Sequence, residues 1–142
     1  MTQELAAALA AEEAAIYAYG VIGVRLTADD EVSRARAAEQ EHRSRRDILV
    51  ARLAELQASS PPAPAAYELP FEVTDREGAL KLAVHVEDGV AQAWRVLLPV
   101  TADAERADAL AHLTDSAVRA TRWRRLAEVT PLTMAFPGRP VS

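Results

Sequence analysis

Eight positions between residues 32 and 56 repeat in alternating steps of three and four, which places them on one face of a long helix. The face is apolar at both ends, but its centre holds Glu39, His42 and Arg46. Ionisable groups on a buried face are costly unless they are paired or bind something. The repeat therefore predicts a helix packed around a buried polar cluster, with Glu39-x-x-His42 as a candidate site. The eight positions are Val32, Ala35, Glu39, His42, Arg46, Leu49, Leu53 and Leu56.

Further apolar repeats predict four helices in all, at about 2–25, 29–57, 75–98 and 102–128. The clearest start signal is Thr74-Asp75-Arg76-Glu77, which has the pattern of a capping box, and Pro99 ends the helix that follows it. A chain of 142 residues, half of them hydrophobic, suffices for one domain over 1–142 and is short for two. We expect an all-α four-helix bundle with an irregular tail at 129–142.

A proline-rich stretch separates the second and third expected helices. Residues 58–71 contain Pro61, Pro62, Pro64 and Pro70, so they cannot be helical. A helix of about 25 residues is roughly 38 Å long, and about 16 extended residues reach roughly 50 Å. The stretch can therefore cross the whole bundle, and we favour a long crossover that leaves the third helix parallel to the second. The alternative is an up-down bundle with a disordered loop.

Acidic residues of the first and third expected helices should meet the candidate site. Glu12 and His42 lie equally far from the first turn, and Glu87 is the central acidic position of the apolar repeat in the third helix. Glu12, Glu39 and Glu87 would thus converge beside one imidazole, with Tyr19 as a polar-core partner. Iron and manganese favour these ligand types, and a di-iron bundle uses one Glu on each of two helices plus Glu-x-x-His on each of the other two.

The fourth expected helix does not complete that pattern. Leu113 and Ser116 stand where a second Glu-x-x-His would be expected. His112 and Asp115 are at the right height but lie roughly 100 degrees off the apolar face, so they are weak candidates. Arg46, a second polar-core partner, follows the Glu-x-x-His pair by one turn and can set a guanidinium against the carboxylates. An ion pair can then replace the metal.

Several longer motifs carry a family resemblance across essentially the whole chain. The chain resembles the ferritin-like superfamily, and more closely the actinobacterial family of ferritin-like domains labelled DUF4439. The resemblance implies a ferritin-like four-helix bundle with a long crossover between the second and third helices, and it implies no established activity. The motifs are AEEAAIYAYGVIG, EQEHRSRRDIL, PAAYELPF, VEDGVAQAW, RATRWR and AFPG.

Composition excludes several classes of function. The net charge of −5, with basic and acidic residues interspersed, argues against nucleic-acid binding, and the absence of cysteine removes disulfides and thiolate chemistry. There is no glycine-rich phosphate loop and no nucleophile elbow. No targeting signal or membrane span is expected, so we expect a cytoplasmic protein without a membrane partner. Gly20 and Gly23 permit close helix approach, which suits a homodimer.

These observations leave three hypotheses about function. The first is a non-catalytic bundle of unknown role with a degenerate di-metal site and no resident cofactor. The second is an iron- or manganese-binding oxidoreductase that uses Glu12, Glu39, His42 and Glu87 as ligands. The third is a dimeric binding or scaffold module.

Overall fold

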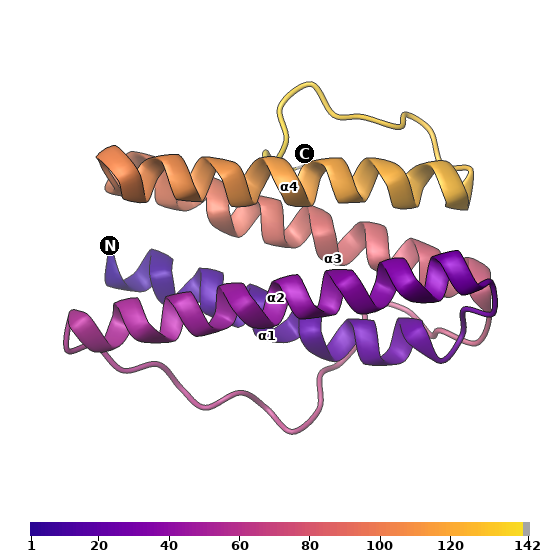
Figure 1. Ribbon diagram of the computed structural model, residues 1–142, viewed down its shortest axis with the longest axis horizontal. Helices are drawn as coiled ribbons and strands as arrows, with labels where there is room; N and C mark the ends of the chain where they lie inside the picture. The colour runs from indigo at the N-terminus through magenta and orange to yellow at the C-terminus, as the bar shows by residue number, and fades with distance from the viewer. Residues whose placement is uncertain (141–142) are drawn as a thin grey trace.

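Four long helices make up most of the chain (Figure 1), and the computed structural model describes residues 1–140. No strand occurs within that range, so the expectation of an all-α, four-helix protein is confirmed. Residues 141–142 of the expected tail lie outside the described residues. The helices are α1 (Thr2–Gly23), α2 (Asp29–Glu55), α3 (Arg76–Leu97) and α4 (Asp103–Ala127), with a single 3-10 turn, η1 (Leu98–Val100), between α3 and α4.

The first and second halves of the chain each form a helix pair. Helix α1 packs against both α2 and α3, and α3 packs against α4. Arg76, at the start of α3, donates from Nε and Nη2 to Glu31, at the start of α2, over 2.9 and 2.7 Å. Helices α2 and α3 therefore begin at the same end of the bundle. The connection between them passes along the outside of the α1–α2 pair (Figure 1), and the ring of Tyr67 lies 5.2 Å from that of Tyr17 on α1.

The start of α3 differs by one residue from the expected capping box. Asp75, not Thr74, is the N-cap, and its Oδ1 accepts a hydrogen bond of 2.8 Å from the backbone N–H of Gly78. Asp satisfies an otherwise unpaired donor of the first turn as well as Thr does. The capping box therefore predicts the correct helix, but it places the N-cap one residue too early.

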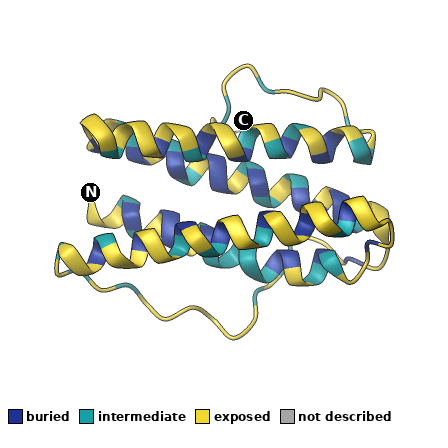
Figure 2. Ribbon diagram, viewed as in Figure 1, coloured by how far each residue is buried: buried dark blue, intermediate teal, exposed yellow. Residues whose placement is uncertain are grey.

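The inner faces of the helices are buried (Figure 2), and their apolar residues form two clusters, one toward each end of the bundle. One cluster centres on Leu9, Leu49 and Trp94. The other centres on Ile22 and Leu80. Polar side chains occupy the level between them, and that level forms the candidate site described below.

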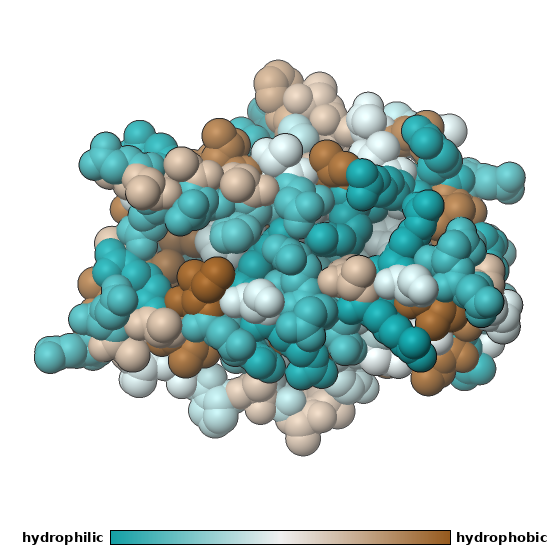
Figure 3. Space-filling view, in the orientation of Figure 1, coloured by the Kyte–Doolittle hydropathy of each residue, from teal (hydrophilic) through white to brown (hydrophobic). Residues whose placement is uncertain are grey.

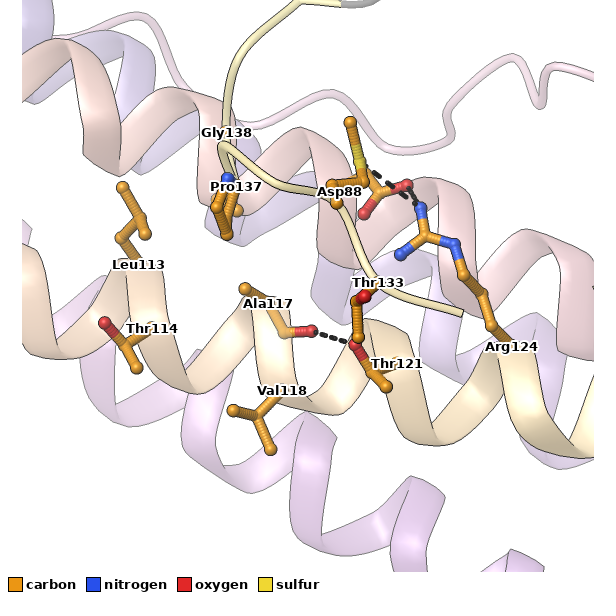
Figure 4. A pocket seen from close by; sticks show the side chains of 12 residues that line it. Asp88, Leu113, Thr114, Ala117, Val118, Thr121, Arg124, Thr133, Pro137 and Gly138 are labelled. Atoms are coloured by element: carbon orange, nitrogen blue, oxygen red, sulfur yellow. Dashed lines mark hydrogen bonds and ion pairs between the residues drawn. The ribbon is translucent and has the colours of Figure 1, made fainter. Parts of the chain in front are cut away.

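The C-terminal segment folds back over α3 and α4 (Figure 4). Arg124 of α4 pairs with Asp88 of α3 beneath it, and Arg95 donates to the carbonyl of Pro137 over 3.0 Å. Gly138 has a φ of 78°, and a Cβ built on it would lie 2.7 Å from the carbonyl oxygen of Ala91. The segment therefore needs glycine at this position. It covers a cavity of about 230 Å³.

Helix α1 is long and apolar enough to span a membrane by length and composition, and 44% of its most apolar stretch is buried inside the bundle. Core helices of water-soluble bundles and N-terminal signal sequences meet the same criterion. Within residues 1–140 it is the one helix that does so.

Candidate functional site

Three buried residues from three helices meet at the middle of the bundle. His42 of α2 places Nδ1 2.5 Å from Oε2 of Glu12 on α1, and Nε2 2.9 Å from Oε2 of Glu87 on α3. All three side chains have no exposed surface. A carboxylate accepts, so an imidazole that faces a carboxylate from each nitrogen donates from both and is an imidazolium.

The surroundings of His42 favour its charged form. Burial by itself lowers the pKa of His42, but its hydrogen bonds to Glu12 and Glu87 and the charges of both carboxylates outweigh burial and raise the pKa to about 9. Burial by itself raises the pKa of the Glu87 carboxyl. The hydrogen bonds from His42 and Tyr19 and the positive charges of His42 and Arg119 outweigh burial, so the net effect is a lowered pKa. His42 and Glu87 therefore hold each other in the charged state.

Both carboxylates accept further hydrogen bonds. Oε1 of Glu12 accepts from the indole N–H of Trp94 over 2.6 Å. Oε2 of Glu87 accepts from the hydroxyl of Tyr19 over 2.5 Å, and that hydroxyl in turn accepts from the indole N–H of Trp123 over 2.9 Å. Burial and the neighbouring charge of Glu87 raise the pKa of Tyr19 well above its ordinary value. Tyr19 thus lies where the sequence places it.

The interior-facing residues of α2 differ from the sequence prediction at two positions. Glu39 lies at the edge of the buried face of α2 and pairs with Arg43 over 3.5 Å. The side chain of Glu39 is 32% exposed. Arg46 pairs with the exposed Asp47 over 3.0 Å. Arg45, with 1% of its side chain exposed, points inward in place of Arg46. The expectation that Glu39 and Arg46 face the bundle interior is therefore wrong.

Two repeats of the same period fit α2, and both contain Ala35, His42 and Leu49. The repeat chosen from the sequence continues through Glu39, whereas the buried face runs through Ala38. Small, uncharged Ala38 is easier to bury than Glu39, and this signal was present in the sequence. Glu-x-x-His is consequently not the motif at the centre of the bundle.

Helix α4 completes the cluster with Asp115, Ser116 and Arg119. Arg45 donates to the hydroxyl of Ser116 over 2.9 Å and to the carboxylate of Asp115. Arg119 donates to Asp115 over 3.0 Å and to Oε1 of Glu87 over 3.3 Å. Asp115, a weak candidate from the sequence, therefore belongs to the network as an acceptor for two arginines at its outer edge.

His112, the other weak candidate, lies outside the hydrogen-bonded network. Its ring packs on Trp94, with 4.6 Å between ring centroids. Burial lowers the pKa of His112, and the nearby charge of Arg45 adds to that effect. His112 therefore favours its neutral form and packs as an aromatic ring.

Among the residues missed, the two arginines carry the clearest sequence signal. Arg45 fits the alternative repeat of α2, and Arg119 follows Asp115 by four residues, the spacing of a helical ion pair. The indole donors gave no such signal, because Trp94 and Trp123 satisfy the apolar repeat and their N–H groups find acceptors only in the assembled bundle. Partners on different helices leave no spacing pattern.

Each cation of the cluster faces carboxylates on other residues of the network. The imidazolium of His42 and the guanidinium groups of Arg45 and Arg119 pair with Glu12, Glu87 and Asp115, and Glu41 lies 3.6 Å from Arg45 at the outer edge. Within residues 1–140, no group of three or more His, Asp or Glu side chains is arranged to hold a metal ion. As hydrogen-bonded here, the imidazole has no free lone pair for a metal. The present arrangement fits an ion network and does not fit a metal centre.

Comparison with known proteins identifies relatives. Residues 4–141 match the family described as a domain of unknown function, DUF4439. The crystal structure of a conserved hypothetical protein, rv2844, from Mycobacterium tuberculosis is similar, with a TM-score of 0.82 and 38% sequence identity over 87% of this chain and 94% of that chain. No protein with a curated description matches the chain.

Proposed function

The chain belongs to the DUF4439 family, and we propose that it is a ferritin-like four-helix bundle in which a buried ion network occupies the place of the di-metal site. On this proposal the protein is not an enzyme. Its central cluster stabilises and aligns the four helices, and it binds no resident metal.

The ferritin-like part of the proposal rests on the order and direction of the helices. The Glu31–Arg76 pair brings the starts of α2 and α3 together, so a long connection has to return along the bundle. Ferritin-like bundles have one such crossover and direct carboxylates from several helices to a common level of the core. Glu12, His42 and Glu87 meet at such a level here.

The non-catalytic part rests on one observation, the engagement of both ring nitrogens of His42 by carboxylates at 2.5 and 2.9 Å. A catalytic metal site keeps an open position and supplies its own positive charge. In this cluster an imidazolium and two guanidinium groups supply that charge. A cation that entered would have to displace the His42 proton and break both hydrogen bonds.

A second candidate is an iron- or manganese-dependent oxidoreductase. It is favoured by the meeting of Glu12, His42 and Glu87 on three helices beside the hydroxyl of Tyr19. Deprotonated His42 and the two carboxylates would hold the ion, which would supply redox chemistry when bound. Glu39 takes no part, because its carboxylate pairs with Arg43 at the surface.

Metal content separates the two candidates. The protein is expressed with added iron and manganese, purified without chelator, and assayed for both metals and for oxygen consumption with ferrous ion. We expect substoichiometric metal, no difference between wild type and Glu12→Gln, and no oxygen consumption above the buffer rate. Glu13→Gln is the matched control, since Glu13 is the sequence neighbour of Glu12 and lies outside the network. Stoichiometric metal in wild type and Glu13→Gln that is lost in Glu12→Gln would establish the oxidoreductase candidate instead.

The expected homodimer, the dimeric scaffold role and the cytoplasmic location stay predictions from the sequence.

A further inference from the structure

An open cleft lies between α2 and α4, beside the buried cluster. It has a volume of about 590 Å³ and is lined from α2 by Arg34, Ala38 and Glu41, and from α4 by Arg119, Arg122 and Trp123. Hydrophilic side chains gather between these two helices on the face shown in Figure 3. The small side chain of Ala38 leaves room on the α2 side of the cleft.

The cleft is more positive than the protein as a whole. It carries three guanidinium groups against one carboxylate, Glu41, in a chain of net charge −5. Arg34 and Arg122 are exposed, and within residues 1–140 neither makes an ion pair or a side-chain hydrogen bond. Arg119 is held in place by Asp115 and Glu87. The cleft thus holds one fixed guanidinium and two whose donors are free.

We propose that this cleft binds a small phosphate-bearing molecule. Guanidinium groups present planar pairs of donors that match phosphate oxygens, and charge-assisted hydrogen bonds of this kind are among the stronger polar contacts. Arginines that line one cleft also repel one another, and an anion relieves that repulsion. The two helices supply donors from opposite walls, Arg34 from α2 and Arg122 from α4, so that the ligand bridges them.

The cleft is joined to the buried cluster by two contacts. Arg119 donates to Glu87, and the indole of Trp123 donates to the hydroxyl of Tyr19. An anion on Arg119 competes with Glu87 for the same guanidinium. Binding therefore perturbs Trp123 and leaves Trp94, which donates to Glu12 on the other side of the network, unchanged. This inference does not depend on the proposed function, because the cleft residues bind an anion whether or not the core holds a metal.

Calorimetric titration of the full chain with pyrophosphate at low ionic strength tests the proposal. We expect saturable binding that Arg34→Gln and Arg122→Gln each weaken by about tenfold, the loss typical of one charged hydrogen-bonding partner. Arg106→Gln is the matched control, because Arg106 is exposed on α4, lies outside the cleft and carries the same charge. It should change the affinity by less than about twofold, since it tests only the net charge of the protein. In NMR spectra the indole N–H resonance of Trp123 should move on titration and that of Trp94 should stay in place.

Three results would overturn the proposal. One is the absence of saturable pyrophosphate binding to the wild type. Another is an equal loss of affinity in Arg106→Gln and the two cleft variants, which would reveal a general charge effect. The third is binding of citrate as tight as that of pyrophosphate and with the same dependence on Arg34 and Arg122, which would replace phosphate by a polycarboxylate as the ligand class. Arg34 and Arg122 are both exposed, so the Gln variants should fold as the wild type does.

Discussion

Nδ1 of His42 lies 2.5 Å from Oε2 of Glu12, although 30 residues separate them in the chain. The same imidazole reaches Glu87 through Nε2 over 2.9 Å. Because this pairing needs an ionised carboxylate on each side of a protonated ring, the charges of three residues on three helices depend on one another.

Removal of His42 should destabilise the fold more than removal of a surface histidine. His42→Gln leaves two buried carboxylates without their cation, and breaking a buried pair by removing one partner costs about 3–5 kcal/mol. Urea unfolding followed by circular dichroism measures the loss. His85→Gln, at an exposed position of α3, should stay within about 0.5 kcal/mol of the wild type. Equal midpoints for the two variants would contradict a structural role for the imidazolium.

Stability should fall as the pH rises from neutral to alkaline. The pKa of His42 is raised to about 9 in the folded protein, against about 6.5 in an unfolded chain. A raised folded pKa contributes stability that is fully present below the unfolded value and is lost as the pH rises through the folded value. The free energy of unfolding should therefore decline between about pH 6.5 and about pH 9.

The variant His42→Gln provides the control for the alkaline loss. It lacks the titrating group, so its free energy of unfolding should be flatter over the same pH interval. On the acid side, the lowered pKa of Glu87 gives stability that is present above the ordinary carboxyl pKa and is lost as the pH falls through the lowered folded value. A wild-type profile parallel to that of His42→Gln above neutral pH would rule out the charged imidazole.

Adjacent arginines of α2 should respond very differently to truncation. Arg45→Ala removes a buried side chain together with its contacts to Ser116 and Asp115, so we expect a loss of about 3 kcal/mol. Arg46→Ala removes a partly exposed side chain that pairs with Asp47, and it should change stability by less than about 0.5 kcal/mol. Thermal or urea unfolding of the two variants compares them directly. A larger loss of stability in Arg46→Ala would support the helix orientation predicted from the sequence, in which Arg46 faces the bundle interior.

Gly138→Ala should release the C-terminal segment from α3. The left-handed backbone at Gly138 and the close carbonyl of Ala91 leave no room for a Cβ, so the substitution should cost about 1 kcal/mol or more. Limited proteolysis should cleave the segment after Val129 faster, while the helices stay intact. Gly89→Ala is the control, because a Cβ there meets nothing within 4 Å and a helical glycine replaced by alanine gains stability. Unchanged proteolysis of Gly138→Ala would show that the tail tolerates a side chain.

The helices were predictable from the sequence because their signals are local. The apolar repeats, Asp75 near the start of α3 and Pro99 after it act within one or two turns, and each observed helix lies within about two residues of its predicted ends. Family membership was equally accessible, since its motifs lie along the whole chain. Counting residues from the turns also predicted that Glu12, His42 and Glu87 lie at the same height along the bundle axis, where they are in contact.

The rotation of α2 was not settled by counting. Two repeats share His42, and they differ in whether Glu39 with Arg46 or Ala38 with Arg45 faces inward, neighbouring residues that point about 100 degrees apart around the helix axis. Packing against α1 and hydrogen bonds to α4 select the second repeat, because Ala38 fits a buried face and Arg45 finds acceptors in Ser116 and Asp115 of α4.

A four-helix chain with acidic and imidazole groups at one level of its core follows from local sequence patterns, since periodicity, caps and prolines are properties of neighbouring residues. Which cations meet the carboxylates depends on how the helices are assembled. The imidazolium of His42 and the guanidinium groups of Arg45 and Arg119 complete the cluster across helices, and such contacts depend on helix rotation and side-chain reach, which no spacing along the chain records.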